Sequence, residues 1–375
     1  MERPDATFAR PAPEALLVIP VRDAAAAVQR TLRAALAARA AAGGWPGRIV
    51  VVDDGSDPAQ AAALADAVRS AHAEPGLAGA LALVRLPASR GPAAARNRGA
   101  REAGAATEVL GFLDADLEVS ARAFIRARSR MASLPHRVAG VFGSYDDRPE
   151  SPGFPGRFRN LLHHWIHQQG AGEAETFWAG LGFLRREAFD AAGGFDETFR
   201  AASIEDIELG LRLRDAGWAL RLDPDLQGRH LKDWSLASAF RADVAHRAYP
   251  WTLLSLTRRR FPSTLNLAAR QRLAAAGALA LPAGLAAAAW FPPAATVAAA
   301  GLGAVVATNR GLYALAARRG GARFALAAVP LHLIHYLASW IGLLGGVAAW
   351  VGGRRLGKRV RGGQRDGRPG SRPPG

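Results

Sequence analysis

The sequence contains no cysteine, and this absence removes several kinds of chemistry. Without a thiol the chain cannot form disulfides, use a thiolate nucleophile or build a zinc–thiolate site. Two nucleotide-binding signatures are missing as well. The turn after the first apolar run reads Val21-Arg-Asp-Ala-Ala, without the G-x-G-x-x-G that lets a pyrophosphate approach the backbone, and no G-x-x-x-x-G-K-[ST] sequence occurs. The sequence therefore argues against an NAD-dependent enzyme and excludes a P-loop NTPase.

Lysine is almost absent, although the chain is strongly basic. There are 48 Lys+Arg against 32 Asp+Glu, a formal net charge of +16, and only Lys232 and Lys358 are lysines. A charge of this size suits nucleic acid or an anionic membrane surface as a partner. Met1–Pro13 has charges and prolines but no apolar h-region. We therefore expect no cleavable signal peptide and an N-terminal domain on the cytosolic side.

Apolar runs alternate with helix-length segments in the first part of the chain. This alternation predicts an α/β domain whose Rossmann-like, mainly parallel sheet is covered by helices on both faces. A loop rich in Pro, Gly and Asp is expected over residues 145–156, and a helix with three histidines should follow it. The expected strands are 15–21, 48–52, 80–85 and a run ending at Leu113, and further helices are expected through about Ala42, after Pro92 and over 204–218.

The last third of the chain contains three long apolar runs, at 273–291, 294–308 and 324–351. A membrane span needs roughly 20 apolar residues, so the first and third are long enough and the second is borderline. We expect a transmembrane region of two to three helices over 273–352, with a soluble all-helical domain as the alternative. The region from 251 to 272 reads as a basic juxtamembrane segment.

Arginines flank these runs and bear on the topology. By the positive-inside rule, the arginines at 258–272 and at 318–323 are cytosolic, which makes the first two runs a hairpin. The tail, 353–375, is also basic, and a single third span would place it outside against the rule, so the topology after residue 320 stays open. We expect the tail to be disordered and to contact anionic lipid headgroups. Nucleic acid is disfavoured because no aromatic residues interleave with its arginines.

Two carboxylates, Asp114 and Asp116, lie one residue apart at the end of the buried run Leu110–Leu113. Strands of open α/β sheets present ligand-binding groups at their carboxyl ends. Two carboxylates there suit Mg²⁺ or Mn²⁺, which keeps waters and takes further oxygens from substrate phosphates. A polar exit from the strand is the other interpretation of such a triplet.

Two further segments suggest contacts to a nucleotide. Asp53 and Asp54 end the second run and could accept hydrogen bonds from a base or ribose, or could simply form a turn with a helix cap at Ser56 or Asp57. Arg96 lies on the first turns of the helix after Pro92, where it could neutralise a diphosphate or be an ordinary exposed arginine.

Glu205 and Asp206 begin a predicted helix, where the helix dipole favours an ionised carboxylate. An ionised carboxylate suits a general base for an alcohol, with acidic capping of the helix as the alternative. His230 could complete a metal shell begun by Asp116. His163 and His167 share a helical face at i, i+4 but lack the glutamate of His-Glu-x-x-His. We expect a surface or membrane-interface role for them rather than metal ligation.

Taken in order, these segments resemble the family 2 glycosyltransferases and their GT-A nucleotide-sugar fold. The resemblance covers about Ala15 to Trp234, and two further segments resemble the acceptor side of the family. The matching segments are Val18–Val21, Val52–Ser56, Ala95–Gly99, Leu113–Asp116 and Ile204–Leu209, with Phe177–Gly182 and Gly193–Glu197 on the acceptor side. The Gln-x-x-Arg-Trp pattern of processive synthases is not present, which argues for transfer of single sugars.

The resemblance implies a role for each matching residue. Asp206 would be the catalytic base, and Asp114 with Asp116 would form the metal-binding pair, with Asp116 and His230 as the expected ligands of Mg²⁺ or Mn²⁺. The implied nucleotide-sugar-binding residues are Pro20, Asp53, Asp54, Arg96, Asp114, Glu205, Lys232 and Trp234. The implied divisions are an N-terminal extension (1–14), a GT-A catalytic domain (15–250), the juxtamembrane segment (251–272), the transmembrane region (273–352) and the tail (353–375).

The resemblance implies a metal-dependent, inverting enzyme that transfers one sugar from a nucleotide-sugar to an acceptor. Apolar runs and flanking arginines favour a lipid or lipid-linked acceptor and a multi-pass protein of the cell membrane with a cytoplasmic catalytic domain. The alternative is a membrane-tethered nucleotide-sugar-binding protein without transfer activity.

Overall fold

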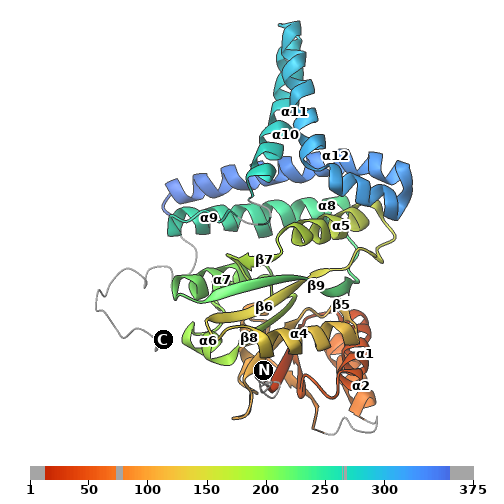
Figure 1. Ribbon diagram of the computed structural model, residues 1–375, viewed down its shortest axis with the longest axis vertical. Coiled ribbons are helices and arrows are strands. Elements are labelled where there is room, and N and C mark those ends of the chain that lie inside the picture. The colour runs from red at the N-terminus through yellow and green to blue at the C-terminus, as the bar shows by residue number, and fades with distance from the viewer. Residues whose placement is uncertain (1–12, 73–78, 264, 266–267, 355–375) are drawn as a thin grey trace, which may run out of the picture.

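The computed structural model describes residues 13–354 except 73–78, 264, 266 and 267. The expected N-terminal extension and basic tail therefore lie almost entirely outside the described residues. Figure 1 shows a mixed α/β domain at one end of the molecule and a group of long helices at the other.

The described strands form one nine-stranded sheet in the order β3-β2-β1-β4-β8-β6-β9-β5, with β7 paired to β9. The runs predicted near the N-terminus are confirmed as neighbouring strands. The strands are β1 (Ala15–Val21), β2 (Arg48–Asp53), β3 (Leu81–Arg85), β4 (Val109–Leu113), β5 (Leu117–Val119), β6 (Val138–Tyr145), β7 (Gly172–Ala174), β8 (Leu181–Arg185) and β9 (Ala219–His230).

The expectation of a mainly parallel sheet is only half right. Strands β3, β2, β1 and β4 are parallel, as is the β6–β9 pair, but β8 runs antiparallel to both β4 and β6. Strands β5 and β7 also run antiparallel to β9. The chain enters β8 beside the carboxyl end of β4, where the amide of Asp114 donates to Gly180 O at 3.0 Å. Because β8 begins where β4 ends, it runs back along β4 in the opposite direction. An apolar run does not encode strand direction, so the sequence pattern missed this.

Helices cover both faces of the sheet, and each face has its own apolar core. One core joins the sheet to α1, α2 and α4, and the other joins it to α3, α6 and α7. The first core is built on alternate β1 residues such as Leu17 and Ile19, and the second on Leu16 and Val18, as expected for side chains that alternate across a strand. These helices are α1 (Ala25–Ala41), α2 (Pro58–His72), α3 (Pro92–Ala100), α4 (Ala121–Ser133), α6 (Arg186–Ala191) and α7 (Glu205–Asp215).

The remaining helices lie beyond the carboxyl edge of the sheet. In Figure 1, α10 and α11 form a hairpin that projects away from the sheet, and α9 and the later part of α12 lie across its base. Helix α12 bends at Gly321, whose φ is 79°, and then packs against η1, α9 and α5. These elements are α5 (Phe154–Gln169), α8 (Leu236–Arg241), the π-helix η1 (Ala242–Ala248), α9 (Tyr249–Arg258), α10 (Ala269–Ala288), the 3₁₀ turn η3 (Pro292–Ala294), α11 (Ala295–Thr308) and α12 (Arg310–Val351).

Among the described helices, α12 alone has the length and apolar composition of a membrane span. The predicted run at 294–308 forms α11, which has only 14 residues. The expectation of two to three membrane-spanning helices is therefore not confirmed.

Candidate active site

The carboxyl ends of β4 and β9 and the start of α7 bring the predicted acidic residues together. Asp114 follows β4, and Asp116 precedes the short strand β5, which pairs with the end of β9. The amide of Leu231 donates to Asp116 O at 2.8 Å, which fixes the end of β9 beside this loop. The edge predicted from the apolar run ending at Leu113 is thus confirmed as the place where these groups meet.

Arg96 links the central strand to the helix that carries Asp206. The guanidinium of Arg96 is buried, with Nη2 at 2.9 Å from Asp114 Oδ1 and Nη1 at 2.8 Å from Glu205 Oε1. Its Nε has no partner within the described part of the chain. Burial raises the pKa of Asp114, and the charge of Arg96 opposes that shift. Arg96 therefore holds two carboxylates in place, in a position where the sequence suggested a contact to diphosphate.

Asp206 lies on the first turn of α7 and faces the segment before β8. Its Oδ2 accepts from Ala179 N at 3.0 Å and its Oδ1 from Ile207 N at 2.8 Å. Burial, and then the charge of Glu205, raise the pKa of Asp206 to about 7, although the two amides and Arg96 act in the opposite direction. The sequence suggested that the helix dipole would keep this group ionised. That expectation was incomplete, because burial beside a second carboxylate outweighs the dipole.

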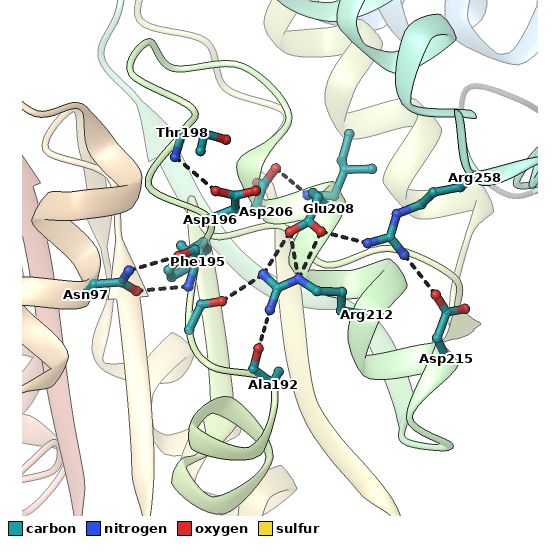
Figure 2. Close-up of polar contacts among 12 residues, drawn as sticks. Asn97, Ala192, Phe195, Asp196, Thr198, Asp206, Glu208, Arg212, Asp215 and Arg258 are labelled. Carbon is teal, nitrogen blue, oxygen red and sulfur yellow. Dashed lines mark hydrogen bonds and ion pairs between the residues drawn. The ribbon is translucent and has the colours of Figure 1, made fainter. Parts of the chain in front are cut away.

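A buried ion-pair network holds α7 in place two residues beyond Asp206. Glu208 is fully buried, and Figure 2 shows Arg212 and Arg258 converging on its carboxylate. Arg212 Nη2 lies 2.8 Å from Glu208 Oε2, and Arg258 Nη2 lies 2.7 Å from Oε1. Arg212 also donates to Gly194 O at 2.7 Å and to Ala192 O. Because Arg258 belongs to α9, this network ties the helix of Asp206 to the helices beyond the sheet.

Close backbone packing also fixes α7. A Cβ placed on Gly210 would come within 2.3 Å of the amide nitrogen of Phe177, so only glycine allows α7 to approach this segment. The segment leads directly to Ala179, the donor to Asp206. The close approach of α7 to the segment before β8 therefore sets the position of the Asp206 carboxylate.

Asp116 and His230 form the second half of the site. His230 Nε2 lies 3.6 Å from Asp116 Oδ2, and His230 Nδ1 lies 2.7 Å from Asn160 Oδ1. Although burial alone would raise the pKa of Asp116, contact with His230 and the charge of Lys232 lower it. The Tyr145 ring stacks on the His230 imidazole with centroids 4.2 Å apart and planes 10° from parallel. Tyr145 and Asn160 thus fix the orientation of the His230 imidazole beside the Asp116 carboxylate.

The fit of this pair to a divalent cation follows from its donor set. No group of three or more His, Asp or Glu side chains able to hold a metal ion occurs within the described residues. One carboxylate and one imidazole leave most coordination positions to water and to substrate phosphates. Mg²⁺ is commonly bound in that way in phosphate-handling sites, so the residues present fit a metal bound together with its substrate.

Asp53 and Asp54 lie at the end of β2, and both are buried. Asp54 accepts from Ser89 Oγ at 2.9 Å, Arg90 N at 2.8 Å and Gly91 N at 2.9 Å. It therefore fixes the loop before α3. Gly91 has φ 94°, and a Cβ there would lie 2.5 Å from Arg200 O, so the loop also requires glycine.

Asp53 accepts from the amide of Ser56 at 2.9 Å, which matches the turn interpretation of this segment. Pro20 is half-buried in β1 and pairs with Val52 of β2. Lys232 is exposed beyond β9, with its Nζ 4.4 Å from the centroid of the Trp234 ring.

The prediction of a surface role for His163 and His167 is wrong. His167 is buried, its Nδ1 lies 2.8 Å from Gly143 O, and burial lowers its pKa to about 4. The His163 ring lies between the rings of Tyr145 and Trp178, and burial lowers its pKa as well. The i, i+4 spacing identified the shared face correctly. That face turns inward because α5 packs on β6.

Sequence reasoning missed Tyr145, Asn160 and Arg159 around this site, and it gave Trp178 only as part of the acceptor-side segment Phe177–Gly182. Tyr145 and Trp178 pack edge to face beside the histidines, and Asn160 contacts His230. Asn160 and Arg159 lie on α5, in the same helix as the histidines. An inward-facing α5 was the signal that could have identified them.

Comparisons with known proteins bear on the family and the fold of this chain. The family model described as Glycosyl transferase family 2 matches residues 16–192. A comparison with curated proteins gives no match. Among solved structures, the chain is similar to the mannosyltransferase PcManGT from Pyrobaculum calidifontis in complex with GDP-Man and Mn²⁺, at 19% identity and a TM-score of 0.55, covering 89% of this chain and 88% of that one.

The chain is also similar to GalNAc-T7 with UDP, GalNAc and Mn²⁺, at 16% identity and a TM-score of 0.44, covering 63% of this chain and 48% of that one. At 19% identity the likeness to the mannosyltransferase shows the fold, which is a GT-A-like α/β fold with a mixed sheet.

Proposed function

Residues 16–192 of this chain belong to glycosyl transferase family 2, and from this we propose that the protein transfers one sugar from a nucleotide-sugar donor to a membrane-associated acceptor, with inversion. The observation that supports the proposal is the bridge from Asp114 through Arg96 to Glu205, which joins the Asp114–Asp116 loop to the start of α7, the helix that carries Asp206. A donor diphosphate at that loop would present its sugar toward Asp206.

Asp206 acts as the general base in this proposal. Its carboxylate accepts the proton of the attacking acceptor oxygen, and a pKa near 7 suits a base that must take up and release protons near neutral pH. Ala179 and Ile207 orient the carboxylate through their amides. Arg96 and Glu205 hold the start of α7 against the donor loop.

Asp116 and His230 would hold Mg²⁺ or Mn²⁺ together with the donor. The bound metal supplies neutralisation of the charge that grows on the departing diphosphate. Asn160 holds the His230 ring through Nδ1, which leaves Nε2 for the metal. The mannosyltransferase of similar fold was solved with GDP-Man and Mn²⁺, which supports this choice of metal and of donor class.

A screen of nucleotide release tests the proposal. Purified protein would be incubated with Mn²⁺ and individual nucleotide-sugars, with and without membrane lipid extract, and free nucleoside diphosphate would be measured. We expect one donor to give release that increases with lipid extract. Asp206→Asn should abolish release while donor binding stays within a few fold. Asp215→Asn, an exposed carboxylate at the other end of α7, is the matched control and should keep the activity.

Donor binding without release by the unaltered protein would contradict the proposal. That result would favour the alternative of a nucleotide-sugar-binding protein without transfer activity.

The membrane part of the proposal rests on the α10–α11 hairpin. Trp290 and Phe291 lie at its tip, 85% and 63% exposed, and the hairpin has no charged residue between Leu273 and Thr308. Helix α10 has 20 residues, about 30 Å of helix, which is the thickness of the hydrocarbon core. We propose that the hairpin enters the membrane from the cytoplasmic side and returns to it. The arginines at 258–272 and 318–323 would then lie on one side, as the positive-inside rule requires.

Helix α12 fits this placement after its bend. Its part beyond Gly321 packs along η1 and α9 and exposes Leu326, Leu344 and Val351. Helices that lie flat in the interface with an apolar face turned to the lipid bind membranes without crossing them. With α12 in the interface, the tail stays on the same side as the catalytic domain. Quenching of Trp290 fluorescence by brominated lipid in a variant with no other tryptophan in the hairpin region would measure the insertion, and no quenching would contradict it.

A further inference from the structure

Arg159 on α5 is a buried arginine whose hydrogen-bonding groups are only partly satisfied. Its side chain is 10% exposed, and its Nη1 lies 2.8 Å from Asp243 Oδ1 and 3.4 Å from Ala239 O. Its Nε and Nη2 have no partner in the described part of the chain. Leaving the donors of a buried charged group unpaired destabilises a protein, so the arrangement needs a reason.

Two more cations surround Arg159. The Arg159 guanidinium and the Lys232 ammonium each lie 4.4 Å from the centroid of the Trp234 ring. Arg247 on η1 is exposed and has no hydrogen bond or ion pair within the described residues. Arg247 lies four residues after Asp243, the η1 residue that pairs with Arg159, and burial and then the charge of Arg247 lower the pKa of Arg159 to about 10.

Few carboxylates compensate this charge. Asp243 is the partner of Arg159, and it is shared with His335 of α12, whose Nδ1 lies 2.8 Å from Asp243 Oδ2. Asp233 accepts from Ser151 Oγ and from the amide of Trp234, and no contact joins it to Arg159. Arg159 and Lys232 on the Trp234 ring, together with Arg247 on η1, are here called the cation cluster, and within the described residues Asp243 is the one carboxylate in ion-pair contact with these three cations.

We propose that the cation cluster binds the phosphate group of an acceptor lipid, which rests on the proposed function and names its substrate class. Arginine suits this role because its planar fork of N–H groups matches phosphate oxygens, and Nε and Nη2 of Arg159 lie on one edge of that fork. Lys232 follows His230 at the end of β9 by two residues, and His230 lies beside Asp116, so the bound phosphate would lie next to the donor site. Trp234 holds both Arg159 and Lys232 in position by cation–π contact.

The surroundings of the cluster favour a lipid as the source of the phosphate. Helices α8 and η1, which carry Ala239, Asp243 and Arg247, also border an apolar groove of about 720 Å³ lined by Leu236, Phe240, Val244 and Ile334 among others. Leu236 and Phe240 are 45% and 38% exposed. A hydrocarbon chain could follow this groove while its phosphate reaches the cation cluster. The other source of the same chemistry is the diphosphate of the donor.

The test is a binding measurement that does not depend on sugar transfer. Calorimetry on the full chain in detergent would use farnesyl phosphate, the uncharged farnesol, and pyrophosphate with Mn²⁺ as three separate probes. We expect farnesyl phosphate to bind tighter than farnesol. Arg159→Gln and Arg247→Gln should each weaken farnesyl phosphate by about 10-fold or more, as for loss of a charge-assisted hydrogen bond. Arg69→Gln, the same change on an exposed arginine of α2 that does not line this groove, is the control and should leave binding unchanged.

Asp243→Asn separates an anion site from a structural ion pair. If Arg159 serves only to pair with Asp243, the variants Arg159→Gln and Asp243→Asn should weaken farnesyl phosphate binding to the same extent. If Arg159 binds phosphate, Asp243→Asn keeps or strengthens farnesyl phosphate binding. Equal loss in both variants, or unchanged binding in Arg159→Gln and Arg247→Gln, would overturn the proposal.

Loss of pyrophosphate binding alone would assign the cluster to the donor and overturn the lipid assignment. Absence of sugar transfer by a protein that still binds farnesyl phosphate through Arg159 would count against the proposed function and leave this site standing.

Discussion

Removing the carboxylate of Glu208 should destabilise the protein far more than removing any nearby surface charge. In Glu208→Gln, two largely buried arginines lose the anion that holds them. Arg212 is 14% exposed and Arg258 is 12% exposed in their side chains, and both pair with this fully buried group at 2.7–2.8 Å. Breaking a buried ion pair by removing one partner typically costs about 3–5 kcal/mol, because the remaining charge is left buried and unpaired.

The loss should be partly offset by the other partners of the two arginines. Arg212 keeps Gly194 O and Ala192 O, and Arg258 keeps Asp215. We therefore expect a decrease of about 3 kcal/mol in the free energy of unfolding, at the lower end of that range. The assay is urea unfolding in detergent followed by tryptophan fluorescence, with the free energy obtained by linear extrapolation.

Asp215→Asn supplies the control for this measurement. Asp215 is 49% exposed, lies on the same helix and pairs with Arg258 and Arg260. Exposed pairs contribute about 0–1 kcal/mol, so its loss should be small. If Glu208→Gln falls within about 1 kcal/mol of the unaltered protein, the buried network does not hold α7 and the reasoning is refuted.

Three further predictions follow from the site. Because burial raises the pKa of Asp206 to about 7 and the base must be deprotonated, initial rates of nucleotide release should rise as pH increases through about 7, and a flat profile from pH 5.5 to 8.5 would contradict its role. Gly91→Ala should lower the free energy of unfolding by at least about 1–2 kcal/mol, because of its positive φ and the approach of Arg200, whereas Gly79→Ala, with a positive φ but open space around it, should cost less. Chelation should abolish nucleotide release, and added Mn²⁺ should restore it. Mn²⁺ with nucleoside diphosphate should raise the melting temperature of the unaltered protein but not that of Asp116→Asn. An equal rise in both proteins would argue against Asp116 as a metal ligand.

The fold could be predicted in part from local patterns. The apolar residues of β1, β2 and β4 form short continuous runs, which are typical of buried strands. The acidic residues directly after β2 and β4 identified the edge of the sheet that carries the site. The direction of β8 could not be predicted, because it depends on where the chain re-enters the sheet after α5. The arrangement of the C-terminal helices could not be predicted either, since α12 bends at Gly321, just before the last apolar run.

By itself, the sequence determined which residue types stand at the ends of strands and at the start of α7, because strand and helix periods and the motif order are properties of adjacent residues. Only the tertiary structure decided what those residues do there. It paired Arg96 with Asp114 and Glu205 across the sheet, raised the pKa of Asp206 by burial, and turned the histidine face of α5 inward. It also brought Arg159 of α5 and Lys232 together on the ring of Trp234. These effects depend on burial and on contacts between residues far apart in the chain, which no local pattern of residues encodes.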